Sequence, residues 1–324
     1  MSLHTCRDQA LAACQPVPLQ QVALADCGHG FLGENLYLAQ DMPAQTEALR
    51  SGYAVAALDM IGASPDMPLP LGPPPILHPA DCLPSGRDAI LPPDATEHGP
   101  DGIHALRAPA PGEGVRRRGH DGRAGLLLAP AGARITPRLR LLAALAGHDT
   151  LSLRRPKLRI ALQDPYQARF AQSWAEGLGA QIVQTNPDLT LLTPSDHSPK
   201  LAYFPAESAW LFSSSEGLVL HLPRRFDGML AALLGLGLPA IAALSGASAR
   251  VQMRPLSQKI SSAVGISEFV LLAEAGEGIL PFPTGNVTIS SLAQASAFAI
   301  LPPESEGLPA GAELPCILLD QPFG

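Results

Sequence analysis

The pattern of hydrophobic and polar positions changes along the chain: short apolar runs come first, an alternation of helix and strand signals follows, and short strands return near the C-terminus. Residues 16–60 and 86–130 hold short apolar runs separated by glycine, proline and other turn residues, a pattern typical of small β structures. Residues 62–79 are so rich in proline that helix is excluded. We expect a loop, an edge strand or a polyproline segment there.

The central part of the chain alternates helix and strand signals. Residues 136–147 begin with a threonine cap and a proline, continue with apolar residues at helical spacing and end with glycine, which predicts a helix. The segments KLRIAL, PYQARFAQSWAEGLG, AQIVQT, LTLLT and GLVLHL then predict strand, helix and three strands. Such an alternation builds a parallel sheet.

The two ends of the chain carry weaker secondary-structure signals than the centre. The first 15 residues predict a short amphipathic helix rather than a signal peptide, so we expect a cytoplasmic protein that is not exported. After Ser245 the pattern returns to short strands, VQMRPL, EFVLLAE, GILPFP, FAILP and ELPCILL, around a small helix near SSLAQASA. This pattern predicts a separate β domain.

Residues 228–249 form an apolar stretch without any charged residue, long enough to span a bilayer. Gly235, Gly237 and Pro239 interrupt it, and no second candidate accompanies it. We favour a buried pair of helices that pack closely through small residues, and we expect no membrane contact.

Composition narrows the function classes. The 324 residues predict two to four compact units. A formal net charge of −7 argues against a nucleic-acid partner. The five cysteines are scattered and form no CxxC pair, which fits reduced thiols in a cytoplasm.

Two possible motifs are better explained as ordinary structure. Residues 28–33 match the GxGxxG spacing, but the residues that follow are too short for a crossover helix before Pro43, so a glycine-rich turn is favoured. His98, His104 and Asp101 have no fixed spacing for a metal, and we expect solvated loop histidines.

Three adjacent arginines stand out in the stretch VRRRGHDG, residues 115–122. They can be a solvated charged face. They can also form a fork for phosphate or another oxyanion, with Asp121 positioning a cation or orienting an arginine. Nucleic-acid binding is the third interpretation.

A second arginine pair lies in the loop PRRFDG, residues 223–228. Arg224 and Arg225 follow a predicted strand and precede a helix, the place where open α/β sheets bind ligands. We therefore favour an anion site. The alternative is that both arginines are surface charges and that Asp227 is only an N-cap.

The order of these segments resembles the molybdopterin molybdenumtransferases. The resemblance rests on SGYAVAALD, LPSGRDAILPPDA, VRRRGHDGRAGLLLAPAGARITPRLRLLAALAG, RRPKLRIAL, ISEFVLLAE and SSLAQASAFAILPPESEGLPAG. It covers nearly the whole chain and is most specific over residues 115–162. It implies an α/β plus β, multi-domain protein.

The resemblance also implies a division into five parts and a homodimer. The expected parts are an N-terminal helix (1–15), a linking domain (16–50 and 115–150), a β-rich lower domain (51–114), an α/β molybdopterin-binding domain (151–247) and a C-terminal β-barrel (248–324). The active site of such proteins forms between the pterin domain of one subunit and the lower domains of the other.

Candidate site residues follow from the matched positions and from the arginine loops. The expected catalytic residues are Asp121 and Asp164. The expected cofactor-binding residues are Arg116, Ser195, Asp196, Pro223, Arg224, Arg225 and Asp227. Metal ligands are not assigned, although the resemblance implies Mg²⁺.

Several motifs of the family are altered in this chain. Ser51 stands where the family has an aspartate, and residues 78–80, 163–166, 193–196 and 204–207 replace motifs that carry hydroxyl, acidic and lysine groups. Losing these groups together predicts weakened or lost catalysis.

The first functional hypothesis is insertion of molybdate into adenylylated molybdopterin, with catalysis weakened or lost. The second is a non-catalytic chaperone that binds molybdopterin or the molybdenum cofactor for a client molybdoenzyme. A scaffold without ligand is the third.

Overall fold

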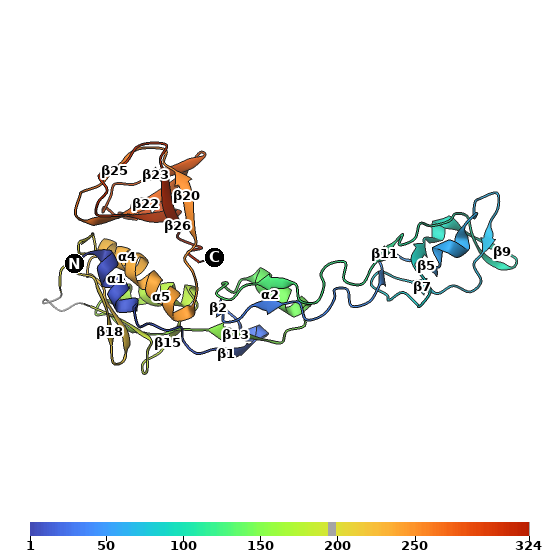
Figure 1. The fold of residues 1–324 in the computed structure, drawn as a ribbon, viewed down its shortest axis with the longest axis horizontal. Coiled ribbons are helices and arrows are strands. Elements are labelled where there is room, and N and C mark those ends of the chain that lie inside the picture. The colour runs from blue at the N-terminus through green and yellow to red at the C-terminus, as the bar shows by residue number, and fades with distance from the viewer. Residues whose placement is uncertain (194–198, 324) are drawn as a thin grey trace. The chain divides into compact units, whose positions relative to one another are not determined.

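The computed structural model describes residues 1–193 and 199–323, which fall into two compact units (Figure 1). Unit 1 contains Met1–Leu36 and Ala129–Gly324, and unit 2 contains Tyr37–Leu128. Each unit has its own hydrophobic cores. The five-part division expected from the sequence stays a prediction.

A five-stranded sheet in unit 1 has the order β15-β14-β16-β19-β18. Its strands are β14 (Lys157–Ala161), β15 (Gln181–Ile182), β16 (Leu189–Leu192), β18 (Trp210–Ser214) and β19 (Gly217–His221). The pairs β14–β15, β14–β16 and β16–β19 are parallel, as the helix–strand alternation predicts, and β18 adds an antiparallel edge.

Helices cover one face of this sheet because alternate strand residues on that face are leucines. Leu158, Leu189 and Leu218 align across three strands and are buried. They share one core with residues of four helices. The helices are α1 (Leu3–Leu11), α3 (Pro165–Gly177), α4 (Phe226–Ala232) and α5 (Leu238–Ser245). In Figure 1, α1 lies beside α4 and α5.

The apolar stretch is a core helix, as expected from its small residues. Residues Phe226–Ser245 have the length and composition to cross a membrane, but 83% of the apolar window is buried inside the structure. The expected break into two helices is wrong. A π-helical segment, η4 (Leu233–Gly237), joins α4 to α5 and accommodates the missing N–H of Pro239.

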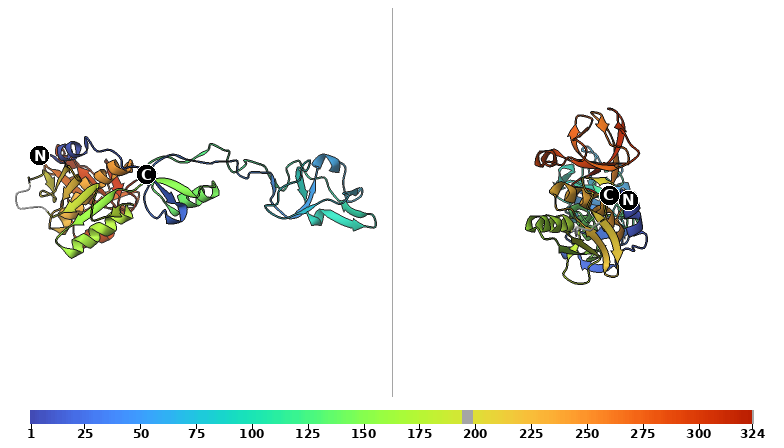
Figure 2. Two further views of the ribbon diagram at one scale, coloured as in Figure 1. Left: turned by 90° about the horizontal axis from the view of Figure 1, so that it is seen from below. Right: turned by 90° about the vertical axis from the view of Figure 1, so that its left-hand side faces the viewer.

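A second large sheet packs against the other side of these helices, so that the helices form a layer between two sheets (Figure 2). Its path is β17-β22-β24-β26-β20, with β23 paired to β22. The strands are β17 (Tyr203–Phe204), β20 (Val251–Pro255), β22 (Ser267–Ala275), β23 (Gly278–Pro281), β24 (Ala297–Leu301) and β26 (Glu313–Leu318). Closure into a barrel stays a prediction.

Strand β22 is buried on both faces and therefore connects two cores. Phe269 and Leu271 face the helices, whereas Val270 and Leu272 belong to a second core. The ribbon of β21 (Ile260–Ser261) and β25 (Gly307–Leu308) and the helix α6 (Ile289–Gln294) complete this β part, where the sequence predicts strands around one small helix.

The remaining sheet of unit 1 has the order β1-β13-β2 and is accompanied by α2. These elements are β1 (Gln20–Ala23), the short helix η1 (Leu24–Asp26), β2 (Phe31–Leu32), α2 (Pro137–Leu145) and β13 (Thr150–Arg154). Thr136 caps α2 by accepting a hydrogen bond from the N–H of Leu139 at 3.2 Å. No helix follows residues 28–33, as expected, but Phe31–Leu32 within this stretch forms strand β2 rather than part of a turn.

Unit 2 is built from short strands around small residues. Two three-stranded sheets have the orders β7-β5-β8 and β6-β10-β9, and β4 pairs with β11. Its elements are β4 (Glu47–Ala48), β5 (Gly52–Val55), η2 (Ala57–Met60), β6 (Leu69–Pro70), β7 (Ile76–Leu77), β8 (Ala89–Leu91), η3 (Pro93–Ala95), β9 (Thr96–Gly99), β10 (Gly102–Ala105) and β11 (Val115–Arg116). Strands β3 (Leu36–Tyr37) and β12 (Leu127–Ala129) lie where the chain passes from one unit to the other.

The expectation of loop histidines needs a correction. His98 and His104 lie on the paired strands β9 and β10, and only Asp101 occupies the turn between them. The His104 ring packs against Gly99, which has no side chain to displace it. No group of three or more potential metal-binding side chains occurs among the residues that the structure describes.

Candidate functional site

The loops that leave β14, β16 and β19 meet at the carboxyl edge of the five-stranded sheet. The N–H of Gln163 donates to the hydroxyl of Thr193 at 3.1 Å, which joins the first two loops. The side-chain amide of Gln167 donates to the carbonyl of Arg224 at 2.6 Å, which joins α3 to the loop after β19. Parallel strands bring these loops together, as the sequence predicts.

Asp164 caps the helix at this edge. One carboxylate oxygen, Oδ1, accepts hydrogen bonds from the N–H groups of Tyr166 and Gln167, both at 2.9 Å. These bonds satisfy two of the unpaired donors at the N-terminus of α3. The carboxylate therefore has a structural task in the place where a catalytic role is expected, and that role stays a prediction.

Among the residues that the structure describes, the arginine loop contains one guanidinium with an ion pair, that of Arg225, and one without, that of Arg224. Arg225 donates to Asp227 through Nη2 at 2.5 Å, and this carboxylate raises the pKa of Arg225. Arg225 remains 79% exposed, whereas only 11% of the Asp227 side chain is exposed. Arg224 is exposed and Pro223 is buried. Both arginines can thus meet a ligand from solvent.

The alternative in which Asp227 is the N-cap is wrong. Arg225 occupies the N-cap position, and Asp227 is the second residue of α4. Its Oδ1 accepts a hydrogen bond from the N–H of Gly228 at 2.8 Å. Asp227 therefore orients Arg225 and stabilises the first turn of the helix.

His221 lies beside this edge at the end of β19. Its ring packs edge-on against Phe212, with ring centroids 5.4 Å apart, and burial lowers the pKa of the imidazole. Burial thus disfavours the charged form of the imidazole. Ser195 and Asp196 lie outside the described residues, so their expected roles stay predictions.

In unit 2, the arginine run is divided between separate partners. Arg116 forms ion pairs with Glu47 and, at 2.9 Å, with Asp121. Arg118 pairs with Asp41 at 2.8 Å. Asp121 thus orients an arginine, one of the two roles considered for it. The expected roles of Arg116 and Asp121 at a ligand stay predictions.

Glu47 is a partner that sequence analysis did not identify. It lies directly opposite Arg116 on the β4–β11 pair, 69 residues earlier in the chain. Strand pairing between such distant residues leaves no local signal. Glu47 could have been found only by predicting the register of two two-residue strands.

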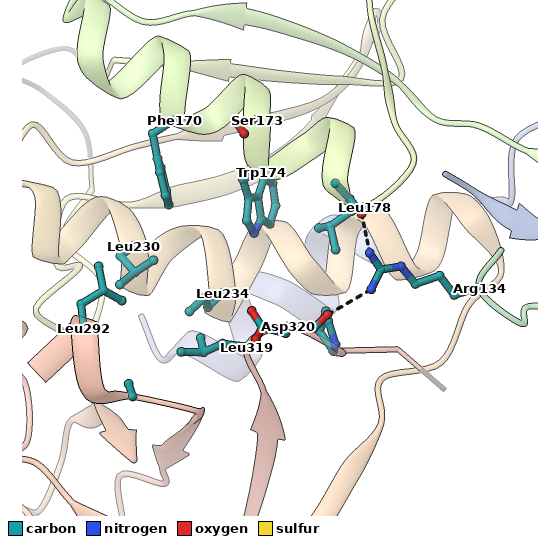
Figure 3. Close-up of a pocket in the computed structure, with 13 residues that line it drawn as sticks. Arg134, Phe170, Ser173, Trp174, Leu178, Leu230, Leu234, Leu292, Leu319 and Asp320 are labelled. Atoms are coloured by element: carbon teal, nitrogen blue, oxygen red, sulfur yellow. Dashed lines mark hydrogen bonds between the residues drawn. The ribbon is translucent and has the colours of Figure 1, made fainter. Parts of the chain in front are cut away.

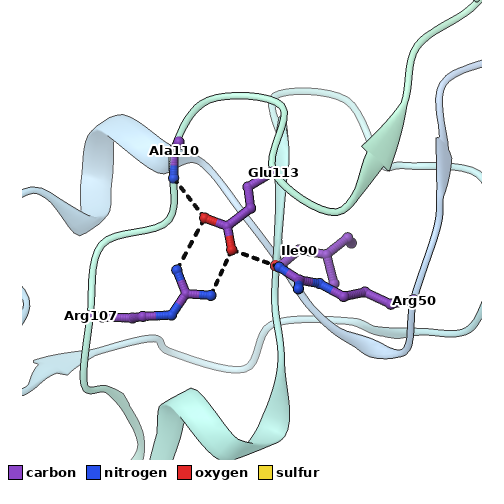
Figure 4. Close-up of polar contacts among 5 residues, drawn as sticks. All are labelled: Arg50, Ile90, Arg107, Ala110 and Glu113. Atoms are coloured by element: carbon purple, nitrogen blue, oxygen red, sulfur yellow. Dashed lines mark hydrogen bonds and ion pairs between the residues drawn. The ribbon is translucent and has the colours of Figure 1, made fainter.

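A second ion cluster of unit 2 is centred on Glu113 (Figure 4). Its carboxylate accepts from Arg107 at 2.6 and 3.0 Å, from Arg50 at 2.7 Å and from the N–H of Ala110 at 3.0 Å. These donors lower the pKa of Glu113 to about 2, with Arg107 the largest cause. Each oxygen of the Glu113 carboxylate already accepts two hydrogen bonds, which indicates a structural role for this residue.

An apolar cavity of about 390 Å³ in unit 1 is a poor candidate for an anionic ligand (Figure 3). Trp174, Phe170 and Leu234 line it. Its only cationic lining residue, Arg134, already donates to the carbonyls of Gly177 at 2.9 Å and Asp320 at 3.1 Å. The guanidinium therefore fastens α3 to the C-terminal segment.

The described carboxylates do not fit a Mg²⁺ site by themselves. Mg²⁺ is held by one or two carboxylates together with substrate phosphates. Asp164 caps a helix, Asp227 pairs with Arg225, and Asp121 pairs with Arg116. Each expected carboxylate is thus already engaged, and the Mg²⁺ expectation stays a prediction.

Comparisons with known proteins agree with this architecture. Residues 1–147 match the family model described as MoeA N-terminal region (domain I and II). A molybdopterin molybdenumtransferase of Synechococcus elongatus is 29% identical over 156 residues, and a molybdopterin molybdenumtransferase 2 of Mycobacterium tuberculosis is 30% identical over 157 residues. Residues 1–147 thus match the N-terminal region of the MoeA family, at moderate divergence.

The match to these two MoeA relatives is partial. It covers 42% and 43% of this chain, and the chain spans only 38% of the length of each relative. Two solved structures of the Pyrococcus horikoshii molybdopterin biosynthesis moeA protein cover more: 98% of this chain, with TM-scores of 0.78 and 0.75. These two matches extend over 99% and 98% of the Pyrococcus chains, at 17% and 19% sequence identity. This likeness shows the multi-sheet α/β plus β fold of MoeA.

Proposed function

We propose that this MoeA-like chain acts in molybdenum cofactor biosynthesis by binding molybdopterin at the carboxyl edge of the five-stranded sheet. The observation that carries the proposal is the joining of three loops there, through Gln163 to Thr193 and Gln167 to Arg224. This edge presents the exposed guanidinium groups of Arg224 and Arg225. A guanidinium group can donate two parallel hydrogen bonds to two phosphate oxygens, so these arginines suit the phosphate of the pterin.

We also propose that insertion of molybdate into the pterin is weakened or lost. Phosphoryl chemistry of this class depends on preorganised charge at the reacting oxygens. Asp164 and Asp227 are each held by other groups at this edge, and Ser51 supplies no carboxylate in unit 2. One missing electrostatic contact commonly costs about 3 kcal/mol in the transition state. Binding is thus better supported than turnover.

The alternative function is a chaperone that holds molybdopterin or the finished cofactor for a client molybdoenzyme. The engaged state of Asp164 favours it, because a chaperone needs the arginines but no free carboxylate. A cytoplasmic homodimer, Mg²⁺, a C-terminal barrel and the five-part division belong to the same proposal, on the family resemblance.

One preparation distinguishes the two functions. The protein is purified from cells that make molybdopterin, oxidised, and assayed for the fluorescence of the released pterin. A parallel sample receives adenylylated molybdopterin, molybdate and Mg²⁺, and release of AMP is followed. We expect bound pterin, with AMP release slow or absent.

Each outcome has a clear meaning. Rapid Mg²⁺-dependent AMP release would contradict weakened catalysis and leave pterin binding intact. Pterin without AMP release would support the chaperone. Absence of pterin, even when molybdopterin is supplied in excess, would refute both functions.

A further inference from the structure

The apolar cavity of about 390 Å³ in unit 1 lies between α3, the α4–η4 run, α6 and the C-terminal segment (Figure 3). Although it does not suit an anion, its volume and its walls are typical of a site for a small organic molecule. Its large apolar lining residues are Phe170, Trp174, Leu178, Leu230, Leu234 and Leu292. The leucines of α4 and η4 are buried, whereas the two aromatic rings are half-buried and remain available for contact with a ligand.

The two aromatic rings of this cavity are held in place by neighbouring side chains and backbone. A Cβ atom at Gly237 would lie 3.0 Å from Cη2 of Trp174, so the indole rests directly on this glycine. Phe170, one turn earlier on α3, packs edge-on against Phe226 with ring centroids 5.8 Å apart. The aromatic wall is therefore formed before a ligand arrives, which lowers the entropic cost of binding.

Asp320 supplies the charge that makes the cavity selective, since it is the only acidic residue among the described residues that line it. In Figure 3 its carboxylate extends toward the space beside Trp174 and Leu234, away from the guanidinium of Arg134. Arg134 donates to the main-chain carbonyl of Asp320 and not to its carboxylate. Within the described part of the chain this carboxylate has no hydrogen bond or ion pair, so an apolar cavity carries a negative charge that lacks a cation.

We propose that this cavity binds a small arylalkylamine, a molecule that joins an aromatic ring to a protonated amine. The ammonium group pairs with the carboxylate of Asp320 beside the ring of Trp174, whose face attracts cations. The aromatic ring of the ligand packs between Phe170 and Leu230. The formal net charge of −7 favours the approach of a cation to the chain. None of the residues assigned to pterin binding lines this cavity, so the amine site does not depend on that function.

Calorimetric titration of the full chain with phenylethylamine, phenylethanol and phenylacetate tests the charge preference. These probes carry a positive charge, no charge and a negative charge beside the same aromatic ring. We expect saturable binding of one phenylethylamine per chain, about tenfold weaker binding of phenylethanol and no binding of phenylacetate, because only the amine pairs with a carboxylate. Lack of saturable amine binding, or phenylethanol binding as tight as that of the amine, would overturn the proposal.

Tryptophan fluorescence tests the location of the bound amine. The chain has two tryptophans, and Trp210→Phe leaves Trp174 as the only one. Phenylethylamine should change the emission of this variant with the same dissociation constant that calorimetry gives. Binding that leaves the emission of Trp174 unchanged would mean that the amine binds elsewhere, and would overturn the site.

Substitution of exposed aspartates separates the role of charge from effects on folding. Asp320→Asn keeps the shape of the side chain and should weaken phenylethylamine binding about tenfold, while phenylethanol binding stays unchanged. Asp149→Asn is the matched control, since Asp149 is exposed and does not line the cavity. Equal amine affinity of Asp320→Asn and the wild type, or equal weakening by Asp149→Asn, would contradict pairing with Asp320.

A further variant distinguishes failure of the amine site from failure of pterin binding. Arg224→Ala/Arg225→Ala changes no residue that lines the cavity and should bind phenylethylamine as the wild type does. A protein that binds no pterin but binds the amine therefore supports the cavity site. Loss of amine binding in this double variant would refute it.

Discussion

Glu113 contacts two arginines of unit 2 at once and shows how a carboxylate of this chain can be committed to structure. Arg107 binds it through two nitrogens, and Arg50 adds a third contact at 2.7 Å. Asp164 and Asp227 are engaged in a similar way at the carboxyl edge of the sheet. At the residue scale, these acids therefore serve capping and pairing, and the groups left for ligands at this edge are arginines.

The low pKa of Glu113 predicts how the stability of unit 2 depends on pH. Its pKa falls from 4.5 to about 2 on folding, so its stabilisation is complete above pH 4.5 and is lost as the pH falls toward 2. We expect Glu113→Gln to lower the free energy of unfolding at pH 7 by about 2 kcal/mol, by weakening charged hydrogen bonds.

Urea unfolding between pH 7 and pH 3 measures this effect. The difference between wild type and Glu113→Gln should shrink below pH 4.5, whereas the exposed Glu97→Gln control should follow the wild type throughout. A difference that stays constant down to pH 3 would contradict the low pKa.

At the scale of elements, the run α4–η4–α5 depends on glycines at points of close packing. A Cβ at Gly235 would lie 2.6 Å from the hydroxyl oxygen of Tyr203, which is fully buried and donates to the carbonyl of Ala231 at 2.9 Å. The side chain of Trp174 approaches Gly237 in the same way. Small residues thus allow the helix to lie between two sheets.

This packing predicts opposite effects for two glycine substitutions. Gly235→Ala should destabilise the chain by about 1–3 kcal/mol, because it forces a buried tyrosine to move. Gly177→Ala at the end of α3 meets no atom within 4 Å and should leave stability unchanged or raise it by about 0.5 kcal/mol. Thermal unfolding monitored by circular dichroism compares the two. Equal stability of both variants would show that Gly235 is not tightly packed.

Elements with strong local signals could be predicted from sequence, and those defined by distant partners could not. The helix α2 has its threonine cap, its proline and a closing glycine within 12 residues. The π segment was not predicted because it arises from fitting Pro239 into a continuous buried helix. The β4–β11 pair that joins Glu47 to Arg116 likewise depends on register rather than on local pattern.

At the scale of the whole molecule, the α/β plus β architecture was predicted because an alternation of helix and strand signals is followed along the chain by a run of short strands, in the order that the family resemblance implies. The match to MoeA structures over 98% of the chain bears this out. The candidate site was predicted only in its location at a sheet edge. The commitment of Asp164 and Asp227 to capping and pairing depends on side-chain geometry that no sequence pattern encodes.

The affinity of the full chain for molybdopterin tests the central claim most directly. Arg224→Ala/Arg225→Ala should bind the pterin at least about tenfold more weakly than the wild type, because two phosphate-binding cations are removed. Arg138→Ala, which removes an exposed arginine of α2, should bind as the wild type does. Equal affinity of the double variant and the wild type would contradict pterin binding at the carboxyl edge of the five-stranded sheet.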